Sequence, residues 1–128
     1  MTTRTAVLSK NAPAPSQLMS QAVIYNGTVY CSGSLGIDPT TGKIVEGGPY
    51  ERTVQAIRNL GAILEAAGSD LSKVIKVNIL SSMDYYTDVN QAYGEIFTSD
   101  PKPCRTCVSV AKLPLDAEVE IELVAALK

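Results

Sequence analysis

The sequence predicts an α+β fold of two layers, in which two helices cover one face of a mixed β-sheet. Three observations indicate this class: six strand-like segments, two segments with helical spacing of apolar residues, and their order along the chain. Two helices can cover only one face of a sheet of this length, so the other face is left to water or to a partner. The length of 128 residues corresponds to a single domain spanning 1–128.

The first half of the chain contains three strand-like segments and a helix. Residues 3–8 are strand-like, and segments 22–25 and 28–32 flank Asn26-Gly27, a dipeptide typical of the two-residue turn of a β-hairpin. A helix is expected from Pro49 to Gly68, because these residue types favour helix ends and apolar residues recur between them at spacings of three and four.

The second half adds a strand, a helix and two further strands. The strand patterns cover residues 73–82, 104–110 and 117–126. Alternation in the first of them places Ile75, Val77 and Ile79 on one face. The second helix is expected to follow Asp84 as its cap and to stop before Pro101, which gives the order βββαβαββ.

The last two strands each carry polar residues on one face. Apolar residues alternate with polar ones, which are Glu118, Glu120 and Glu122 in one strand and Arg105, Cys107 and Ser109 in the other. We expect the apolar sets to face the helices and these six residues to share the uncovered face. An antiparallel hairpin would place Arg105 opposite Glu122 and Cys107 opposite Glu120.

Composition limits the chemistry that is available. The chain has no His, which excludes Ser-His-Asp and Cys-His catalysis and His-based ribonuclease chemistry. Its net charge of −2 and scattered basic residues argue against nucleic acid as a partner. A metal is not expected, since Cys104 and Cys107 form the one C-x-x-C. On a strand their odd separation turns the thiols to opposite faces, so redox chemistry is the less favoured interpretation.

Several features bear on the cellular location. No apolar run approaches the roughly 20 residues that cross a bilayer, so no membrane association is expected. The first 37 residues contain Arg4 and Lys10 but no acid, as mitochondrial presequences do, yet strand-like residues begin almost at once. The odd number of cysteines favours a reducing compartment. We therefore expect a cytoplasmic protein, with a mitochondrial location as the alternative.

Two runs near the end of the chain are the most distinctive motifs: PCRTCVSVAKLP at 103–114 and VEIELVA at 119–125. Shorter runs precede them, namely SQA at 20–22, CSGSLGIDP at 31–39, LEAAG at 64–68, VIKV at 74–77 and VN at 89–90. In this order, and over nearly the whole chain, they resemble the RidA/YjgF family of reactive intermediate deaminases, also called L-PSP endoribonucleases.

The resemblance implies a chorismate-mutase-like fold that assembles as a homotrimer with active sites in clefts between subunits. It implies an enzyme without cofactor that hydrolyses reactive 2-imino or 2-enamino acids, released by pyridoxal-phosphate-dependent serine or threonine dehydratases, to 2-keto acids and ammonium. Two alternatives stay open: a non-catalytic protein that binds small carboxylates or keto acids and, less favoured, an endoribonuclease or translation inhibitor.

The resemblance also assigns roles to individual residues. The family's carboxylate-binding arginine falls on Arg105 and its acidic catalytic partner on Glu120. A guanidinium suits the first role because its parallel N–H donors match a carboxylate, and a carboxylate suits the second because it can move protons to and from water. The remaining substrate-binding positions fall on Cys107, Ser32, Asn90 and Met19, where Met19 replaces a common tyrosine.

Simpler interpretations of the same residues exist. From spacing alone, Arg105 is typical of a surface or interface ion pair with Glu120 or Glu122, and alternating glutamates are typical of a solvated face. Ser32 has no His to activate it and is expected to be a structural hydroxyl, while Cys107 is expected to be a small buried residue.

Overall fold

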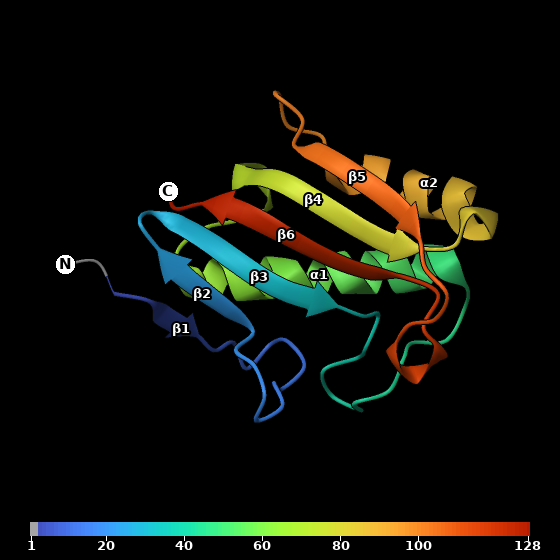
Figure 1. Cartoon of the computed structure of the whole chain (residues 1–128), viewed down its shortest axis with the longest axis horizontal. Helices are drawn as coiled ribbons and strands as arrows, with labels where there is room; N and C mark the ends of the chain where they lie inside the picture. The colour runs from blue at the N-terminus through green and yellow to red at the C-terminus, as the bar shows by residue number, and fades with distance from the viewer. Residues whose placement is uncertain (1–2) are drawn as a thin grey trace.

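All strands of the computed structural model, which describes residues 3–128, belong to one sheet (Figure 1). The strands are β1 (Thr5–Val7), β2 (Ala22–Tyr25), β3 (Thr28–Ser34), β4 (Val74–Ser81), β5 (Cys104–Ser109) and β6 (Glu120–Ala126). The helices are α1 (Pro49–Ala67) and α2 (Tyr86–Ile96), with short 3₁₀ turns η1 (Leu71–Lys73), η2 (Met83–Tyr85) and η3 (Pro114–Asp116). The predicted order βββαβαββ is confirmed.

The hairpin of β2 and β3 forms where the sequence predicts it. Tyr25 pairs with Thr28, and the two residues between them have positive φ angles, 53° at Asn26 and 74° at Gly27. Both central residues of this turn type require that conformation, which Asn and Gly adopt at the lowest cost. The hairpin fixes β3 beside β2 and leaves its other edge to pair with β6.

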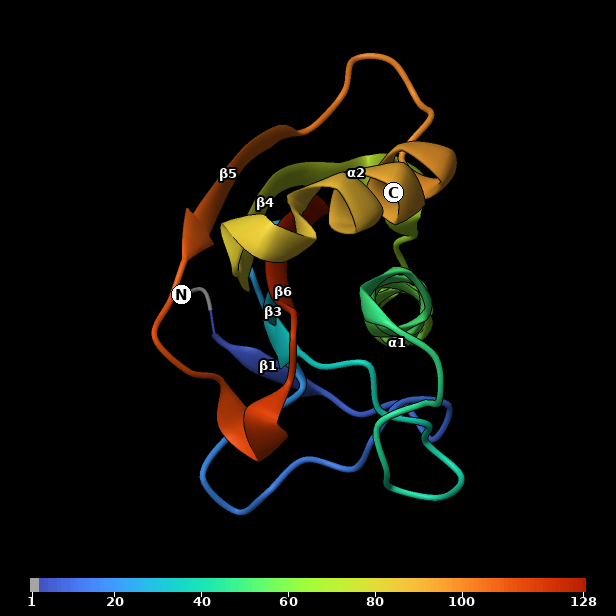
Figure 2. The same cartoon turned by 90° about the vertical axis from the view of Figure 1, so that its right-hand side faces the viewer.

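Helix α1 begins and ends at the residues that the sequence indicates. The Oε1 atom of Glu51 accepts a hydrogen bond of 2.8 Å from the backbone N–H of Gly48, and Gly68 ends the helix with a φ of 86°. The helix buries Ile57, Leu60 and Leu64 completely. Figure 2 shows α1 and α2 on the same side of the curved sheet, which confirms the two-layer α+β architecture.

Helix α2 begins later than the sequence suggests. The expected cap, Asp84, lies inside the η2 turn, and the capping side chain is Ser82, whose Oγ accepts a 3.2 Å hydrogen bond from the Asp84 N–H. The helix proper starts at Tyr86 and buries Val89 and Ala92. No helix within residues 3–128 combines the length and the apolar character that a membrane span requires.

The last two strands do not pair with each other, so the predicted hairpin is wrong. The sheet order is β1-β2-β3-β6-β4-β5: β6 lies between β3 and β4, antiparallel to both, and β5 forms the edge, parallel to β4. The central place of β6 buries Ile121, Leu123 and Ala125 under the helices. A strand with this apolar face stabilises the fold more in the centre of the sheet than at its edge.

The position of β5 also corrects the predicted face of Arg105 and Cys107. Arg105 lies beside Val77 and Cys107 beside Ile79, and both β4 residues are fully buried under the helices. Paired residues of neighbouring strands point to the same face. Arg105 and Cys107 therefore face the helix layer, while Val108, which was expected there, is 42% exposed on the other face.

Two smaller expectations are wrong as well. Ile75 is 49% exposed because the pairing of β4 with β6 shifts register between Val74 and Lys76, and Val74 is buried in its place. Glu118 precedes β6 and forms an ion pair with Arg52 of α1 instead of lying on a solvated face.

The uncovered face of the sheet keeps two of the six expected residues. Ser109 is not one of them, because it pairs with the buried Ser81 of β4 and shares the helix-side face of Arg105 and Cys107. Glu120 and Glu122 point to this face, since they alternate with the buried residues of β6, and Asn78 of β4 donates a 3.4 Å hydrogen bond to Glu122. Tyr25 and Tyr30 are exposed on it, by 39% and 48% of their surface. An exposed face with several large apolar side chains is typical of a surface that a partner covers.

Candidate functional site

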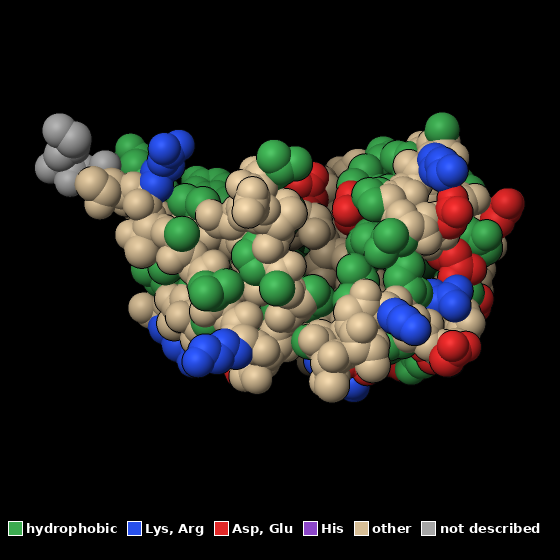
Figure 3. Space-filling view, turned by 90° about the horizontal axis from the view of Figure 1, so that it is seen from below, with side chains coloured by type: hydrophobic (Ala, Val, Ile, Leu, Met, Phe, Trp, Pro, Cys, Tyr) green, Lys and Arg blue, Asp and Glu red, His purple; other side chains and the backbone are tan. Residues whose placement is uncertain are grey.

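A cavity of about 260 Å³ lies where the end of β3 and the start of β6 meet the loop before β2. It is lined by Pro13, Ala14, Pro15, Ser16, Met19, Gln21, Ser32, Gly33, Ser34, Leu35, Ile37, Asn59, Ile63, Pro114 and Glu120. Figure 3 shows the molecule from below relative to Figure 1, and a hollow runs across the middle of this face. The cavity brings together three of the predicted site residues: Met19, Ser32 and Glu120.

Glu120 supplies the titratable group of this cavity. Burial raises the pKa of its carboxyl group above the ordinary value, and the negative charge of Glu122 on the same face raises it further. A raised pKa keeps a fraction of the carboxyl groups protonated at higher pH than usual, so the group can both give and accept protons. This is the behaviour that proton transfer to and from a small substrate needs.

Ser32 has a structural role in the wall of the cavity. Its hydroxyl donates a 2.7 Å hydrogen bond to the carbonyl of Ser20, and its backbone N–H donates a 3.0 Å hydrogen bond to the carbonyl of Gln21. Both bonds tie the end of β3 to the loop that carries Met19. The hydroxyl is therefore engaged with the backbone, as expected for a structural serine.

Two buried amides hold the loops around the cavity, and neither was among the expected site residues. The side chain of Gln21, 3% exposed, accepts a 2.6 Å hydrogen bond from the Ser9 N–H and donates to the carbonyls of Ser9 and Pro13, at 3.1 and 2.8 Å. On the other side, Asn59 is 1% exposed and donates to the carbonyls of Leu35 and Ile37, at 3.3 and 2.8 Å. The signal in the sequence for Asn59 is a polar residue beside the apolar stripe of α1.

Arg105 lies in a second cluster, on the helix side of the edge strand. Its Nη2 donates a 2.7 Å hydrogen bond to Oδ1 of Asn90 in α2, and its guanidinium carbon lies 4.7 Å from the ring centre of Tyr93 and 5.9 Å from that of Tyr86. Cys107, half-buried, points to the same face two residues further along β5. Of the predicted site residues, Arg105 and Asn90 are therefore in contact here, and Cys107 lies on the same face of β5.

The two clusters do not meet within one chain. Glu120 lies on the uncovered face of the sheet and Arg105 on the helix face, and Arg105 is not among the residues that line the cavity. Arg105 also forms no ion pair with any carboxylate in residues 3–128, so the simpler interpretation of a pair with Glu120 or Glu122 is wrong within the chain. Each cluster is one half of the predicted site.

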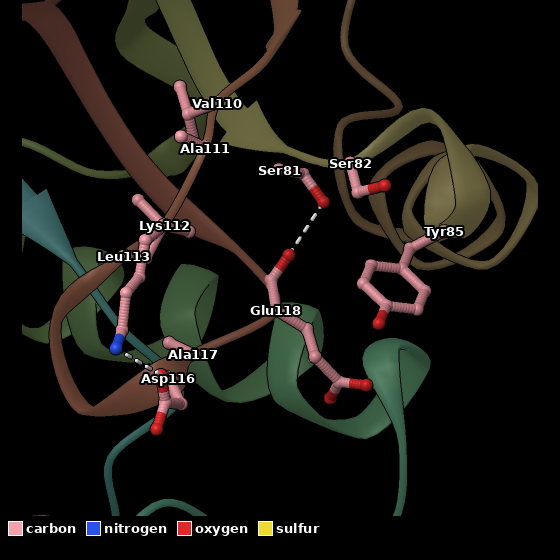
Figure 4. Close-up of a pocket in the computed structure, with 10 residues that line it drawn as sticks. All are labelled: Ser81, Ser82, Tyr85, Val110, Ala111, Lys112, Leu113, Asp116, Ala117 and Glu118. Atoms are coloured by element: carbon pink, nitrogen blue, oxygen red, sulfur yellow. Dashed lines mark hydrogen bonds and ion pairs between the residues drawn. The ribbon is translucent and has the colours of Figure 1, made fainter.

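A further cavity, of about 220 Å³, lies at the carboxyl ends of β4 and β5 (Figure 4). Ser81 donates a 2.6 Å hydrogen bond to the carbonyl of Glu118, and Lys112 pairs with Asp116 at 3.2 Å. Tyr85 and Glu118 also line this cavity. None of the predicted site residues lines this cavity.

The three cysteines are free thiols. Cys31 is buried in the core, and burial raises its pKa to about 12, which leaves it protonated and unreactive at neutral pH. Cys104 is exposed and pairs along the strand with Lys76, while Cys107 points to the helix side. Their placement on opposite faces of β5 is as expected from their spacing.

Comparison with known proteins places the chain in a family. The family model of Endoribonuclease L-PSP matches residues 9–127. A curated relative from Drosophila melanogaster, the RutC family protein UK114, is 45% identical over 95% of this chain and 88% of its own length. The human 2-iminobutanoate/2-iminopropanoate deaminase is 39% identical over 95% of this chain and 89% of its own.

A solved structure shares the fold. E. coli TdcF, in a crystal structure with bound serine, has a TM-score of 0.90 at 27% identity, covering 97% of this chain and 99% of that protein. The two-layer sheet and these matches define a small α+β protein of the RidA type. The chain belongs to the Endoribonuclease L-PSP family, which is the RidA/YjgF family that its motifs resemble.

Proposed function

We propose that this protein hydrolyses reactive 2-imino and 2-enamino acids to 2-keto acids and ammonium. The observation that carries the proposal is a guanidinium, that of Arg105, which is held in place but has no carboxylate partner in residues 3–128. A fixed, unpaired guanidinium is suited to bind the carboxylate of a small acid in one orientation. The name of the human relative supports the same substrate class.

The proposed reaction needs a positioned water and proton transfer. An imine carbon is electrophilic, so the oxygen of water attacks it to form the C–O bond. The C–N bond then breaks, the two water protons pass to nitrogen, and the iminium acid and water become a keto acid and ammonium. Glu120 is suited to relay these protons because burial raises its pKa. Arg105 contributes by orientation, since a substrate fixed by its carboxylate presents the same carbon to the water each time.

We further propose that a homotrimer unites the two half-sites, with Arg105, Cys107 and Asn90 of one copy next to Met19, Ser32 and Glu120 of another. The separation of Arg105 from Glu120 within one chain supports this arrangement. The uncovered face with its exposed Tyr25 and Tyr30 supplies an apolar surface for the contact. No cofactor takes part in the proposed reaction, and neither nucleic acid nor a membrane is proposed as a partner.

A second candidate function is the binding of small carboxylates or keto acids without catalysis. Met19 favours it, because this residue lines the cavity where the family commonly presents a tyrosine hydroxyl, and a thioether cannot donate a hydrogen bond. E. coli TdcF was crystallised with serine, a small carboxylate, and so fits either function. Ribonuclease activity is not proposed, since the chain has no His and no basic patch.

The decisive experiment generates the imine in place. A serine or threonine dehydratase releases the intermediate, and keto-acid formation is recorded with and without this protein. We expect the keto acid to form faster when the protein is present, at a rate that rises with the concentration of the protein. If several imine acids yield keto acid and ammonium at the uncatalysed rate, the enzyme proposal falls and the binding function takes its place.

A further inference from the structure

The hydrogen-bond and ring partners of the Arg105 guanidinium are all neutral, and it forms no ion pair within residues 3–128. Asn90 offers an amide oxygen at 2.7 Å, and Tyr93 offers the face of its ring at 4.7 Å. The more distant Tyr86 offers a second ring at 5.9 Å. A cationic side chain that is partly buried usually pairs with an acid, so a guanidinium held by neutral partners alone is a distinctive arrangement.

Neutral contacts stabilise a guanidinium without cancelling its charge. The amide dipole and the electron-rich face of an aromatic ring both attract the cation, but neither carries a net negative charge. A carboxylate in the place of Asn90 would keep the same geometry but would neutralise the positive charge of Arg105, which an incoming acid needs for binding. The identity of residue 90 therefore decides whether the guanidinium is available to a ligand.

The ring of Tyr93 is itself fixed by packing. It lies 4.6 Å from the ring of Phe97, centre to centre, at an angle of 35°. Its hydroxyl oxygen is buried and has no hydrogen-bond partner within the described residues. The ring face, and not the hydroxyl, is thus what this residue contributes to Arg105.

We propose that Asn90 and Tyr93 are positioning residues, which aim the Arg105 guanidinium from α2 and leave its charge uncompensated so that it accepts the carboxylate of the substrate. This assigns Asn90 to the arginine and not directly to the substrate. The proposal rests on the proposed function only in naming Arg105 as the carboxylate-binding group, and it is tested by binding, without turnover.

The first test replaces Asn90 by Asp in the full-length protein. Asn90→Asp preserves the shape and the hydrogen bond to Arg105 but adds the compensating charge. We expect the affinity for 2-oxobutanoate, measured by calorimetry, to fall about tenfold or more, as for the loss of a charge-assisted pair. Gln91→Glu is the matched control: it adds the same charge to an exposed position of α2, and the affinity should change by less than about twofold, as for a screened surface charge.

The second test concerns the ring. Tyr93→Leu keeps an apolar side chain but removes the aromatic face, and the affinity for 2-oxobutanoate should fall about threefold to tenfold, as for the loss of a cation–π contact. Tyr93→Phe restores the face and should recover most of the lost affinity. Thermal denaturation of each variant separates this effect from loss of the fold, because Tyr93→Leu also removes the ring that packs on Phe97, whereas Tyr93→Phe keeps it.

Three outcomes would overturn the inference. They are wild-type affinity in Asn90→Asp, equal loss in Tyr93→Leu and Tyr93→Phe, or absence of 2-oxobutanoate binding by the native protein. If the native protein binds this acid and the variants behave as expected, but no imine is hydrolysed, the inference stands and the proposed enzymatic function fails.

Discussion

Gly33 of β3 and Glu120 of β6 are in direct contact, and no larger residue fits at position 33 while Glu120 keeps its place. A Cβ atom on residue 33 would stand 2.8 Å from Cδ and 3.0 Å from Oε2 of Glu120. The backbone of Gly33 does not lie in the left-handed region, so space and not conformation requires the glycine. The Glu120 carboxylate thus packs against the β3 backbone at Gly33.

Gly33→Ala should therefore displace the Glu120 carboxylate. We expect kcat for imine hydrolysis to fall about tenfold or more with a smaller change in KM, because misplacement of a proton-transfer group affects the chemical step. The free energy of unfolding should change little, by about 0.5 kcal/mol, because Gly33 is exposed and the displaced atoms are the end of a flexible side chain. The control is Gly94→Ala in α2, where a Cβ meets no atom within 4 Å. A Gly33→Ala enzyme with native kcat would contradict the role given to Glu120.

Arg105→Ala should abolish the acceleration of imine hydrolysis, because the substrate loses its carboxylate-binding group. The fold should persist, since the hydrogen bond to Asn90 and the ring contact contribute only about 1–2 kcal/mol. Arg105→Lys should restore little activity, because one ammonium cannot form the parallel pair of hydrogen bonds. Ammonium release is the measurement, and Arg58→Ala, at an exposed position of α1, is the control. Native ammonium release by Arg105→Ala would show that the site lies elsewhere.

The titration of Glu120 should be visible in both activity and stability. Burial raises its pKa, so its charged form is disfavoured in the folded state. Below the ordinary glutamate pKa of about 4.3 the group is protonated in both the folded and unfolded states and costs nothing. As pH rises through that value, the charged carboxylate begins to lower the free energy of unfolding. This destabilisation is complete above the raised folded pKa and persists at neutral pH.

Glu120→Gln should consequently stabilise the fold at neutral pH and have no such effect at low pH, as measured by denaturation at several pH values. The same variant should retain affinity for a keto acid but slow the water step and remove the part of the pH–rate profile that Glu120 controls. If Glu120→Gln were less stable than the native protein at pH 7 and equally stable at pH 4, the direction of the pKa shift would be wrong.

Gln21→Leu should loosen the loop that lines the cavity. The substitution leaves a buried N–H of Ser9 and the carbonyls of Ser9 and Pro13 without their partner. Unpaired buried backbone groups are costly, so we expect a loss of about 2–4 kcal/mol in the free energy of unfolding and a lower Tm. Gln17→Leu, in the same loop but exposed, should leave Tm nearly unchanged. Equal Tm values for the two variants would remove the structural role assigned to Gln21.

Met19→Tyr separates the two candidate functions. The residue lines the cavity and is 45% exposed, so a larger ring has room to adjust. In an imine hydrolase the added hydroxyl should raise kcat/KM severalfold by donating a hydrogen bond near the reacting centre. In a pure binding protein, keto-acid formation should stay at the uncatalysed rate in both forms.

The sequence predicts the elements better than their arrangement. Asn26-Gly27, Pro49 and Gly68 are local signals, because backbone conformation at these residues limits the choice of structure. The place of β5 has no such signal. The alternation of apolar and polar residues in β5 is compatible with either neighbouring strand, and the short connection from β5 to β6 is typical of a hairpin. The chain instead crosses the end of β4, through a turn with positive φ at Leu115 (59°) and Asp116 (53°). Asp adopts this conformation readily, but Leu rarely does, so Leu115 gives no signal for such a turn.

The candidate site was predictable to the same degree. The motifs indicate Glu120, Ser32 and Met19, which share one cavity, and Arg105 and Asn90, which are hydrogen-bonded to each other. Which face each cluster occupies follows from strand order and could not be derived from alternation. The amides of Gln21 and Asn59 were missed because their partners are backbone groups of irregular loops, whose path the sequence pattern does not predict.

The separation of Arg105 and Glu120 on opposite faces of the sheet has a genetic consequence. In the proposed ring of three copies, a chain that lacks only the arginine still donates an intact glutamate to its neighbour, and the reverse holds for a chain that lacks only the glutamate. Two impaired alleles, Arg105→Ala and Glu120→Gln, should then complement each other when expressed together, because every mixed trimer contains one junction with a native arginine and a native glutamate. The heterozygote would be functional where each homozygote is not.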